Sequence, residues 1–496
     1  MLANQLDQMT PGQNVSVERL SALNKALRAN GNLLAKAAQA GYPAQGQAVT
    51  GGDYAALIPQ SIQNTLDTAS FTEHAIKFWT KIFKQPVAST LHESAVTQAY
   101  GEMALDPFIS EGGVGSTSDG VYDRKIVKIK YLAEKREISD VATMVGIVGY
   151  NGVSKQGLAQ QTLDGTRALL GKTERALFNA NSSLSPLHFD GLFRQIARNA
   201  DDTAFSANYS DLEGEACTPQ KIIERMYQVA DSPNFGFTNL IMVPPRLYAS
   251  LVAIAMSYGR FDQAKAGHGE LVFGSEGLKI VGPGGLIPVE QCPLMLQPQT
   301  VTAGVGTIDP SAAVAVQTQT AASIDAASRF RAKDEGDYKY SVVGVGDKGV
   351  NAETTDLNVV SVATGEKVTF TLNDDGLAAA GTPNGIRYYR VYRSAADDTT
   401  GARTHMVDVA RNLNADGTPA GKTTITDLNE FRPGTAPVYL LQMTPDVMYW
   451  AQLLDFIRRP LAQVTTTVPF LLMLFGALHV KVPTKCWVIG NAAQSL

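Results

Sequence analysis

Cysteine is scarce in this sequence, and its three cysteines, Cys217, Cys292 and Cys486, lie far apart. Three cysteines cannot form a complete set of disulfides, and no two are spaced like the paired ligands of a zinc site. We therefore expect reduced thiols, with an intermolecular disulfide as the alternative, and we expect neither a metal nor a cofactor.

A surplus of basic residues is also missing. The chain has 42 lysines and arginines against 47 aspartates and glutamates, which gives a net charge of −5. Proteins whose main role is to grip nucleic-acid phosphates usually carry a basic excess or a basic stripe. The composition therefore argues against sequence-specific recognition of DNA or RNA.

Long hydrophobic runs are absent as well. The longest apolar run, residues 469–480, has twelve residues, whereas a membrane-spanning helix needs about twenty. The N-terminus lacks the basic start and apolar stretch of a secretion signal. We expect no membrane span and synthesis in the cytoplasm, and we interpret residues 469–480 as a buried pair of strands.

The 496 residues exceed the roughly 250–300 at which a single core stops growing, so two or more domains are expected. Residues 1–60 are rich in Gln, Asn, Ala and Gly, with one plausible helix at 17–38. An arm this polar cannot bury enough surface to fix its own position. Residues 58–86 are more apolar and include Phe78 and Trp79, which could anchor the chain.

Residues 100–138 predict a long β-hairpin. A glycine-rich turn at 110–120 precedes a strand in which lysines and apolar residues alternate. The alternation predicts Lys128 and Lys130 on one face and Val127, Ile129 and Tyr131 on the other. A two-stranded ribbon is marginal alone in water, so we expect a neighbouring subunit to cover it. The candidate contact residues between subunits are Lys125, Lys128, Lys130, Val127, Ile129, Tyr131, Phe78 and Trp79.

Residues 154–180 predict one long helix, with leucines recurring every seven residues at 163, 170 and 177. Three glycines within it, at 157, 165 and 171, suggest close packing against a flat element such as a sheet. Residues 218–300 alternate helix and strand, with helices predicted at 219–230 and 246–259 and a buried strand at 240–245. This pattern indicates a compact α+β unit.

From about residue 301 the composition shifts to Thr, Val, Ala, Asp and Gly, and short strand-like runs are separated by polar turns. This spacing favours an all-β sandwich. The runs are 338–346, 366–372, 386–394, 404–410 and 422–428. We expect the flanks 293–298 and 438–443 to pair with each other, residues 444–459 to form a helix, and the C-terminus to supply closing strands.

Residues that could carry chemistry do not form a convergent cluster. Gly171-Lys172-Thr173 resembles the end of a phosphate-binding loop, but Thr166 stands where that motif needs glycine, and the tripeptide falls inside a predicted helix. The six histidines show no metal-binding spacing. A calcium site at Asp374-Asp375 or Asp397-Asp398 and a DNA-facing role for Arg458-Arg459 and Lys481 are open alternatives to ordinary polar surface. We therefore expect no catalytic residues and no enzyme.

The order of these pieces resembles the Hong Kong 97-like fold of tailed-phage major capsid proteins. Individual stretches look like that family too. Residues 134–142 resemble the join between extended loop and spine, 174–192 the end of the spine helix, 242–261 and 277–295 the axial domain, and 475–491 the closing strands. Residues 325–436 resemble a fibronectin type III or immunoglobulin-like module.

The resemblance implies an α+β fold with several parts. These are an N-terminal arm (1–60), a peripheral domain (61–98 and 136–215) with a spine helix (154–180), an extended loop (99–135), an axial domain (216–300), an inserted immunoglobulin-like or fibronectin-like β-sandwich (301–437), and a return to the axial and peripheral domains (438–496).

The resemblance also implies a function. Subunits of the family form hexamers and pentamers that close into an icosahedral head around double-stranded DNA, which touches the inner face without sequence specificity. Scaffolding and portal proteins are implied partners, a decoration protein is another candidate, and the virion is the implied location. An encapsulin-like compartment shell and a phage or cell-surface adhesin with an Ig-like module are the alternatives.

Overall fold

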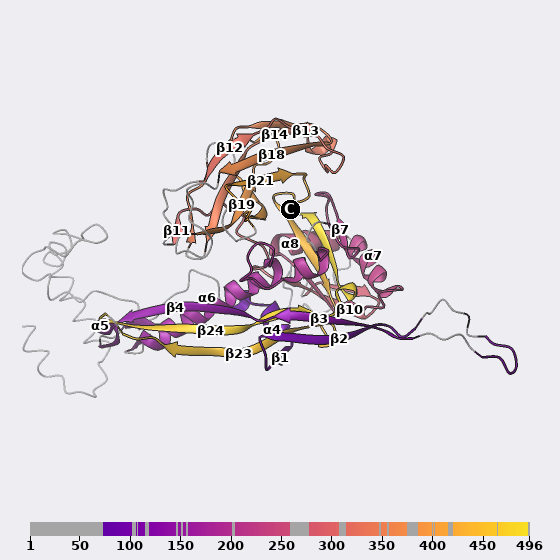
Figure 1. Ribbon diagram of the computed structural model, residues 1–496, viewed down its shortest axis with the longest axis horizontal. Helices are drawn as coiled ribbons and strands as arrows, with labels where there is room; N and C mark the ends of the chain where they lie inside the picture. The colour runs from indigo at the N-terminus through magenta and orange to yellow at the C-terminus, as the bar shows by residue number, and fades with distance from the viewer. Residues whose placement is uncertain are drawn as a thin grey trace, which may run out of the picture. The chain divides into compact units, whose positions relative to one another are not determined.

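The computed structural model describes parts of the chain between residues 73 and 494 (Figure 1). The described ranges are 73–101, 106, 108–114, 119–144, 147–149, 152–154, 157–200, 204–257, 277–306, 314–346, 349–354, 357–373, 385–398, 400, 402–414, 420–463 and 465–494. The predicted arm at 1–60 and the helix at 17–38 lie outside them. Contacts group residues 67–147 and 154–496 into one unit, and everything below concerns that unit.

The first sheet has the strand order β1-β23-β24-β4. The central strand β24 (Thr467–Val480) is almost entirely apolar, and it pairs antiparallel with β23 (Met448–Pro460) on one side and β4 (Lys130–Ser139) on the other. β1 (Lys84–Pro86) pairs parallel with β23. A strand with neighbours on both sides and a covered face can be continuously hydrophobic, which explains the composition of β24.

Helix α6 (Gly157–Asn179) packs on one face of this sheet. At Gly165 an added Cβ would lie 2.6 Å from a methyl of Leu472 on β24 and 3.1 Å from Arg136 on β4. This confirms that a glycine of the predicted helix marks close packing against a sheet. The predicted helix is confirmed within three residues at its start and one at its end.

Three predictions in the C-terminal region are wrong. Residues 444–459, predicted as a helix, form most of strand β23, because backbone pairing with β24 outweighs local preference. Residues 469–480 lie in one strand instead of a pair, since Gly476 makes room for the Trp450 ring and no turn forms there. Residues 293–298 form no strand, and β22 (Thr435–Leu441) pairs instead with β8 and β25.

The second sheet has the order β7-β25-β22-β8-β10-β9. Helix α7 (Pro219–Ala230) starts where the Thr218 side chain accepts a hydrogen bond from the Lys221 N–H and Pro219 supplies a preset φ. The predicted helix at 219–230 is confirmed, and the second predicted helix corresponds to α8 (Pro245–Ser257). The remaining strands are β7 (Tyr209–Asp211), β8 (Leu240–Val243), β9 (Lys279–Gly282), β10 (Gly285–Gln291) and β25 (Trp487–Ala493).

Residues 301–434, called the β-rich segment below, contain two further multi-stranded sheets. Strands β11-β16-β15-β19-β20 form one, and β12, β13 and β21 pair with β18 in the other. Buried residues from both sheets meet in one cluster, including Tyr340, Tyr389 and Phe370. The strands are β11 (Val305–Gly306), β12 (Ala315–Gln319), β13 (Ser323–Ile324), β14 (Gly336–Tyr338), β15 (Tyr340–Gly346), β16 (Gly349–Val350), β17 (Val360–Val362), β18 (Glu366–Asn373), β19 (Ile386–Arg393), β20 (Thr404–Ala410) and β21 (Lys422–Asp427).

All five runs predicted as strands in this segment are strands or parts of strands. Their buried positions alternate where one face meets the cluster, as in β21, whose burial pattern alternates strictly between exposed and buried. Short helical elements complete the described fold. They are η2 (Glu73–Ala75), α4 (Phe78–Lys81), α5 (Asp140–Met144), η3 (Phe193–Ala197), η5 (Ala332–Asp334) and η6 (Pro483–Lys485).

Candidate functional site

A two-stranded ribbon forms the first candidate surface. Strands β2 (Leu91–Ala99) and β3 (Val121–Lys128) pair antiparallel with each other only, and the ribbon extends beyond the end of the first sheet (Figure 1). The predicted hairpin is confirmed only in part, because its first strand, Leu91–Ala99, lies before the predicted range of 100–138 and its second strand ends at Lys128. After Ile129 the same chain continues as β4, which pairs with β24 instead of β2. Among the strands that the structure describes, none therefore pairs with either outer edge of the ribbon.

The two faces of the ribbon differ in exposure. One face is half-buried and includes His92, Ser94 and Val127. The other face is exposed, and three of its apolar side chains retain large exposed fractions: Leu91 43%, Ile126 56% and Tyr122 74%. Apolar side chains gathered on an exposed, two-stranded element are typical of a surface that another chain covers.

The structure corrects which residues form the apolar outer face. Val127, Ile129 and Tyr131 do not share one environment, since Ile129 is 4% exposed and Tyr131 is 61% exposed. The reason is the change of pairing partner at Ile129, which breaks the simple alternation between β3 and β4. Lys128, predicted opposite the apolar face, lies on the exposed face beside Ile126 and Leu91.

The remaining candidate contact residues are mostly bound within the chain. Phe78 and Trp79 are 0% and 6% exposed, so their side chains are core residues and offer no surface to a neighbour. Lys125 pairs with Asp123 at 2.7 Å, and Lys130 donates to the Pro186 carbonyl at 2.5 Å. Of the predicted contact residues, Lys128 and Tyr131 are the exposed ones.

A second apolar surface lies on the first sheet, on the face opposite α6. Tyr131 of β4 packs edge-on against Phe475 of β24, with ring centres 4.8 Å apart. Ile457 of β23, 41% exposed, lies opposite Met473 in the register. These residues alternate with ones that contact α6, such as Arg136 and Leu472. Sequence analysis identified only Tyr131 of this group, because the pairing of three distant strands assembles it.

Two histidines attach the ribbon to the first sheet. His92 of β2 hydrogen-bonds the Tyr449 hydroxyl at 2.7 Å, and Ser94 hydrogen-bonds His479 Nε2 at 2.7 Å. His479 is 4% exposed. Burial, followed by the positive charges of His92, Lys481 and Lys125, lowers the pKa of His479 to about 4. The contact between Ser94 and His479 therefore suits an uncharged His479 imidazole.

A buried carboxylate anchors the chain just before the first strand. Glu174 of α6 accepts hydrogen bonds from the backbone N–H groups of Lys77, Phe78 and Trp79 at 3.0, 2.7 and 2.8 Å. Its side chain is fully buried, and burial raises its pKa despite these donors. Cys292 contributes a fourth contact at 3.4 Å. This arrangement fixes residues 77–79 on the helix.

Two of the residues singled out for chemistry, Lys172 and Thr173, have structural partners, whereas Asp374 and Asp375 lie outside the described residues. Lys172 of the Gly171-Lys172-Thr173 tripeptide pairs with Glu134 at 2.5 Å, and the Thr173 hydroxyl donates to the Leu169 carbonyl within α6. Across the described ranges, no group of three or more His, Cys, Asp or Glu side chains could hold a metal. Within the same ranges, no helix is long and apolar enough to cross a membrane.

Comparison with known proteins adds a direct link to function. No protein-family model matches the chain. The major capsid protein of Staphylococcus phage S25-3 is 24% identical over 475 residues, which cover 88% of this chain and 90% of the relative. Among solved structures, the capsid of a native GTA particle aligns over 91% of this chain at 10% identity with a TM-score of 0.44. The SrpI encapsulin of Synechococcus elongatus aligns over 90% at 9% identity with a TM-score of 0.38.

Proposed function

We infer that this chain is a major capsid protein, the subunit that assembles into the icosahedral head of a tailed phage. The observation that carries this inference is similarity to phage major capsid proteins along almost the whole chain, 88% of this sequence and 90% of the relative. Similarity of that extent leaves about 12% of the chain unmatched. A structural role also agrees with the contacts that Lys172 and Thr173 make within the chain.

We propose that the architecture is the Hong Kong 97-like capsid fold. In this proposal the β2–β3 ribbon is the extended loop, α6 is the spine helix, the first sheet belongs to the peripheral domain and the second sheet to the axial domain. The β-rich segment would be an immunoglobulin-like or fibronectin-like β-sandwich, supported by two sheets that share one buried cluster. The domain boundaries given from the sequence remain part of this proposal.

The proposed contact between subunits joins the two apolar surfaces described above. The exposed ribbon face, with Leu91, Tyr122 and Ile126, would lie on the sheet face of a neighbouring copy that carries Tyr131 and Ile457. Each surface exposes apolar area that its own chain leaves uncovered, and covering it stabilises by roughly 25 cal/mol per Å². Obligate interfaces of assemblies commonly bury 2,000 Å² or more, so many such contacts would close a stable shell.

The proposed partners follow from assembly in a phage head. They are other copies of the chain in hexamers and pentamers, scaffolding and portal proteins during assembly in the host cytoplasm, and double-stranded DNA on the inner face. A decoration protein is a further candidate partner. A shell that encloses DNA does not need to bind its phosphates strongly. The net charge of −5 is therefore compatible with this role.

The experiment is expression of the full-length chain, alone and with the phage scaffolding protein, followed by cryo-electron imaging and native mass measurement. We expect closed icosahedral shells built from hexamers and pentamers. Small uniform cages that enclose a cargo enzyme would instead support the encapsulin-like alternative. A chain that stays monomeric or trimeric under both conditions would support an adhesin and overturn the capsid assignment.

A further inference from the structure

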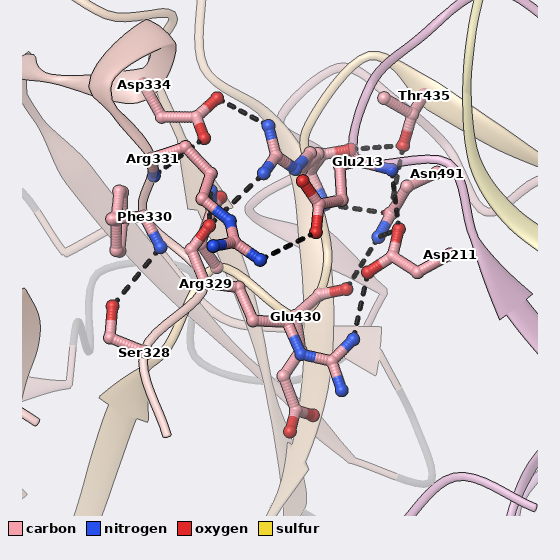
Figure 2. Close-up of polar contacts among 12 residues, drawn as sticks. Asp211, Glu213, Ser328, Arg329, Phe330, Arg331, Asp334, Glu430, Thr435 and Asn491 are labelled. Carbon is pink, nitrogen blue, oxygen red and sulfur yellow. Dashed lines mark hydrogen bonds and ion pairs between the residues drawn. The ribbon is translucent and has the colours of Figure 1, made fainter. Parts of the chain in front are cut away.

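The β-rich segment is connected to the second sheet by a cluster of polar side chains, shown in Figure 2. On the sheet side the cluster contains Asp211 at the end of β7, Glu213 just after it, and Asn491 of β25. On the other side it contains arginines and acidic residues of the β-rich segment. We call this cluster the arginine clamp. It comprises Asp211, Glu213, Asn491, Arg329, Arg331, Asp334, Glu430 and Arg432.

Asn491 is the central member of the clamp. Its amide nitrogen donates to Asp211 and to the Glu430 carbonyl, both at 2.8 Å, and its oxygen accepts from the Arg432 backbone N–H at 3.1 Å. The side chain is 6% exposed. A buried amide whose donors and acceptor are all used fixes the geometry of the groups around it, so the exit from the β-rich segment is held at one position.

Ion pairs between the two sides reinforce this position. Arg329 pairs with Asp211 at 2.9 Å and Arg331 with Glu213 at 3.1 Å. Within the β-rich segment itself, Arg432 pairs with Asp334 and also donates to the Arg329 carbonyl at 3.2 Å. Isolated surface ion pairs contribute little, but here the Arg432 and Asp211 side chains are only 7% and 13% exposed and share partners.

An aromatic cluster lies beside the clamp and adds a second, apolar attachment. Phe431 of the β-rich segment contacts Phe193 and Phe205, with ring centres 5.9 and 6.1 Å apart. The guanidinium of Arg198 stacks on Phe205 at 4.0 Å and pairs with Glu430 at 3.2 Å. Cation–π contacts of this kind are stronger where water is excluded. Burial of Phe431 therefore also depends on the orientation of the β-rich segment.

The start of the β-rich segment is also held by backbone contacts. Thr300 bridges to Thr404 of β20, and the His405 N–H donates to the Gln299 carbonyl at 3.1 Å. A cleft of about 240 Å³ separates the two attachments and is lined from both sides, for example by Tyr209 and His405. The β-rich segment is thus attached to the rest of the chain at both of its ends. It can change its orientation only if the contacts at one end break.

We propose that the arginine clamp holds the β-rich segment in one fixed orientation on the second sheet, so that the two move as a single rigid body, and that Asp211 and Arg329 are its positioning residues. The segment is then not a flexibly tethered appendage. This inference concerns contacts within one chain and does not depend on the proposed function.

The test measures the distance distribution between two spin labels in the full-length chain. Cysteines are introduced at exposed positions, Thr426→Cys in β21 and Gln220→Cys in α7. The native cysteines are buried and should not react. Labelled protein is diluted with unlabelled protein, so that distances within one molecule dominate. The clamp variant carries Asp211→Asn and Arg329→Met, both close in size to the native residues.

A matched control removes an ion pair inside the β-rich segment. Lys367→Met breaks the pair with Asp325, whose side chains are 33% and 27% exposed. We expect one narrow distance peak in the parent and in the control, and loss of that peak in the clamp variant. A parent distribution that is already broad, or a clamp variant as narrow as the control, would overturn the proposal. Should the clamp variant fail to fold, Glu213→Gln with Glu430→Gln tests the same joint with the same outcomes.

Discussion

Glu174 shows how one residue can fix the path of a chain segment. Its buried carboxylate accepts three backbone N–H groups from residues 77–79. We expect Glu174→Gln to lower the free energy of unfolding by about 1–3 kcal/mol, because the amide NH2 would face a backbone donor and leave it unpaired. Chemical denaturation of the unassembled subunit measures this difference. Glu134→Gln, which changes a carboxylate paired at the edge of α6, is the control and should cost less.

The pH dependence of this effect has a defined sign. Burial raises the pKa of Glu174 above its usual 4.5, so the folded state binds its proton more tightly than the unfolded state does. The contribution of Glu174 to stability is therefore largest below pH 4.5 and declines as the pH rises through the folded-state pKa. The difference in free energy of unfolding between the parent and Glu174→Gln should therefore become smaller as the pH rises. A gap that widens with pH would contradict the burial explanation.

His479 has the opposite dependence. Its pKa falls from 6.5 to about 4 in the folded chain, so the stability that depends on neutral His479 is present above pH 6.5 and is lost as the pH falls towards 4. One pKa unit corresponds to about 1.4 kcal/mol, so the loss from pH 6.5 to 4 amounts to at most about 3.5 kcal/mol. We expect His479→Gln to flatten the parent's decline in stability across this interval, measured by denaturation at a series of pH values. An unchanged pH profile in the variant would rule out this role.

The sequence positions of Glu174 and His479 already indicate that both side chains are buried. Glu174 stands four residues after Leu170 and three before Leu177, on the apolar stripe of the predicted helix. A carboxylate at such a position needs a buried partner. His479 lies inside the apolar run at 469–480. The partners themselves, backbone groups of residues 77–79 and Ser94, were beyond prediction because they come from distant parts of the chain.

At the scale of secondary-structure elements, local signals succeeded where they did not compete with long-range pairing. The helix predicted at 219–230 corresponds to α7, and the strand-like runs at 404–410 and 422–428 correspond to β20 and β21. The helix predicted at 444–459 is wrong because residues 447–451 are buried at consecutive positions. Such a pattern does not distinguish strand from helix. The pairing of β23 with β24 decides the outcome.

The ribbon supplies the prediction for this scale. Ile126→Asp combined with Tyr122→Asp places charges on the exposed face, where the unassembled subunit has no need of the apolar side chains. We expect the subunit to keep its melting temperature and to lose shell assembly, since a neighbour would have to bury two unpaired carboxylates. Light scattering and electron microscopy of assembly reactions measure this.

A control with the same chemistry at a more exposed position is available in the β-rich segment. Ile324 of β13 is 85% exposed, and Ile324→Asp introduces the same kind of charge away from the ribbon. We expect this variant to assemble normally. Normal assembly of the ribbon variant would show that the exposed ribbon face makes no contact between subunits, and a lower melting temperature would show that the face is needed within the chain.

For the whole molecule, the composition of the sequence separated the β-rich segment from the two α/β sheets, and the segment has its own buried cluster. Composition could not reveal how it is attached, because Arg329, Phe431 and Arg432 look like ordinary residues of a polar turn region. From the sequence alone, removal of residues 303–436 is expected to leave assembly intact. The structure makes that deletion unfavourable, since it also removes the start of β22 and the partners of Asn491 and Phe193.

A better deletion keeps the residues that complete the second sheet. Removing residues 301–428 with a short Gly/Ser linker leaves Glu430, Phe431 and Arg432 in place, and both ends lie near the same cleft, lined by Gln299 and Thr435. We expect this shorter deletion to assemble into shells and the 303–436 deletion to be less stable, because Phe193 and Phe205 lose an aromatic neighbour and Asn491 loses three hydrogen bonds. Melting temperature and particle yield compare the two. Equal yields would mean that the β-rich segment and its junction contribute nothing to the second sheet, whereas failure of both would mean that the shell depends on the segment itself.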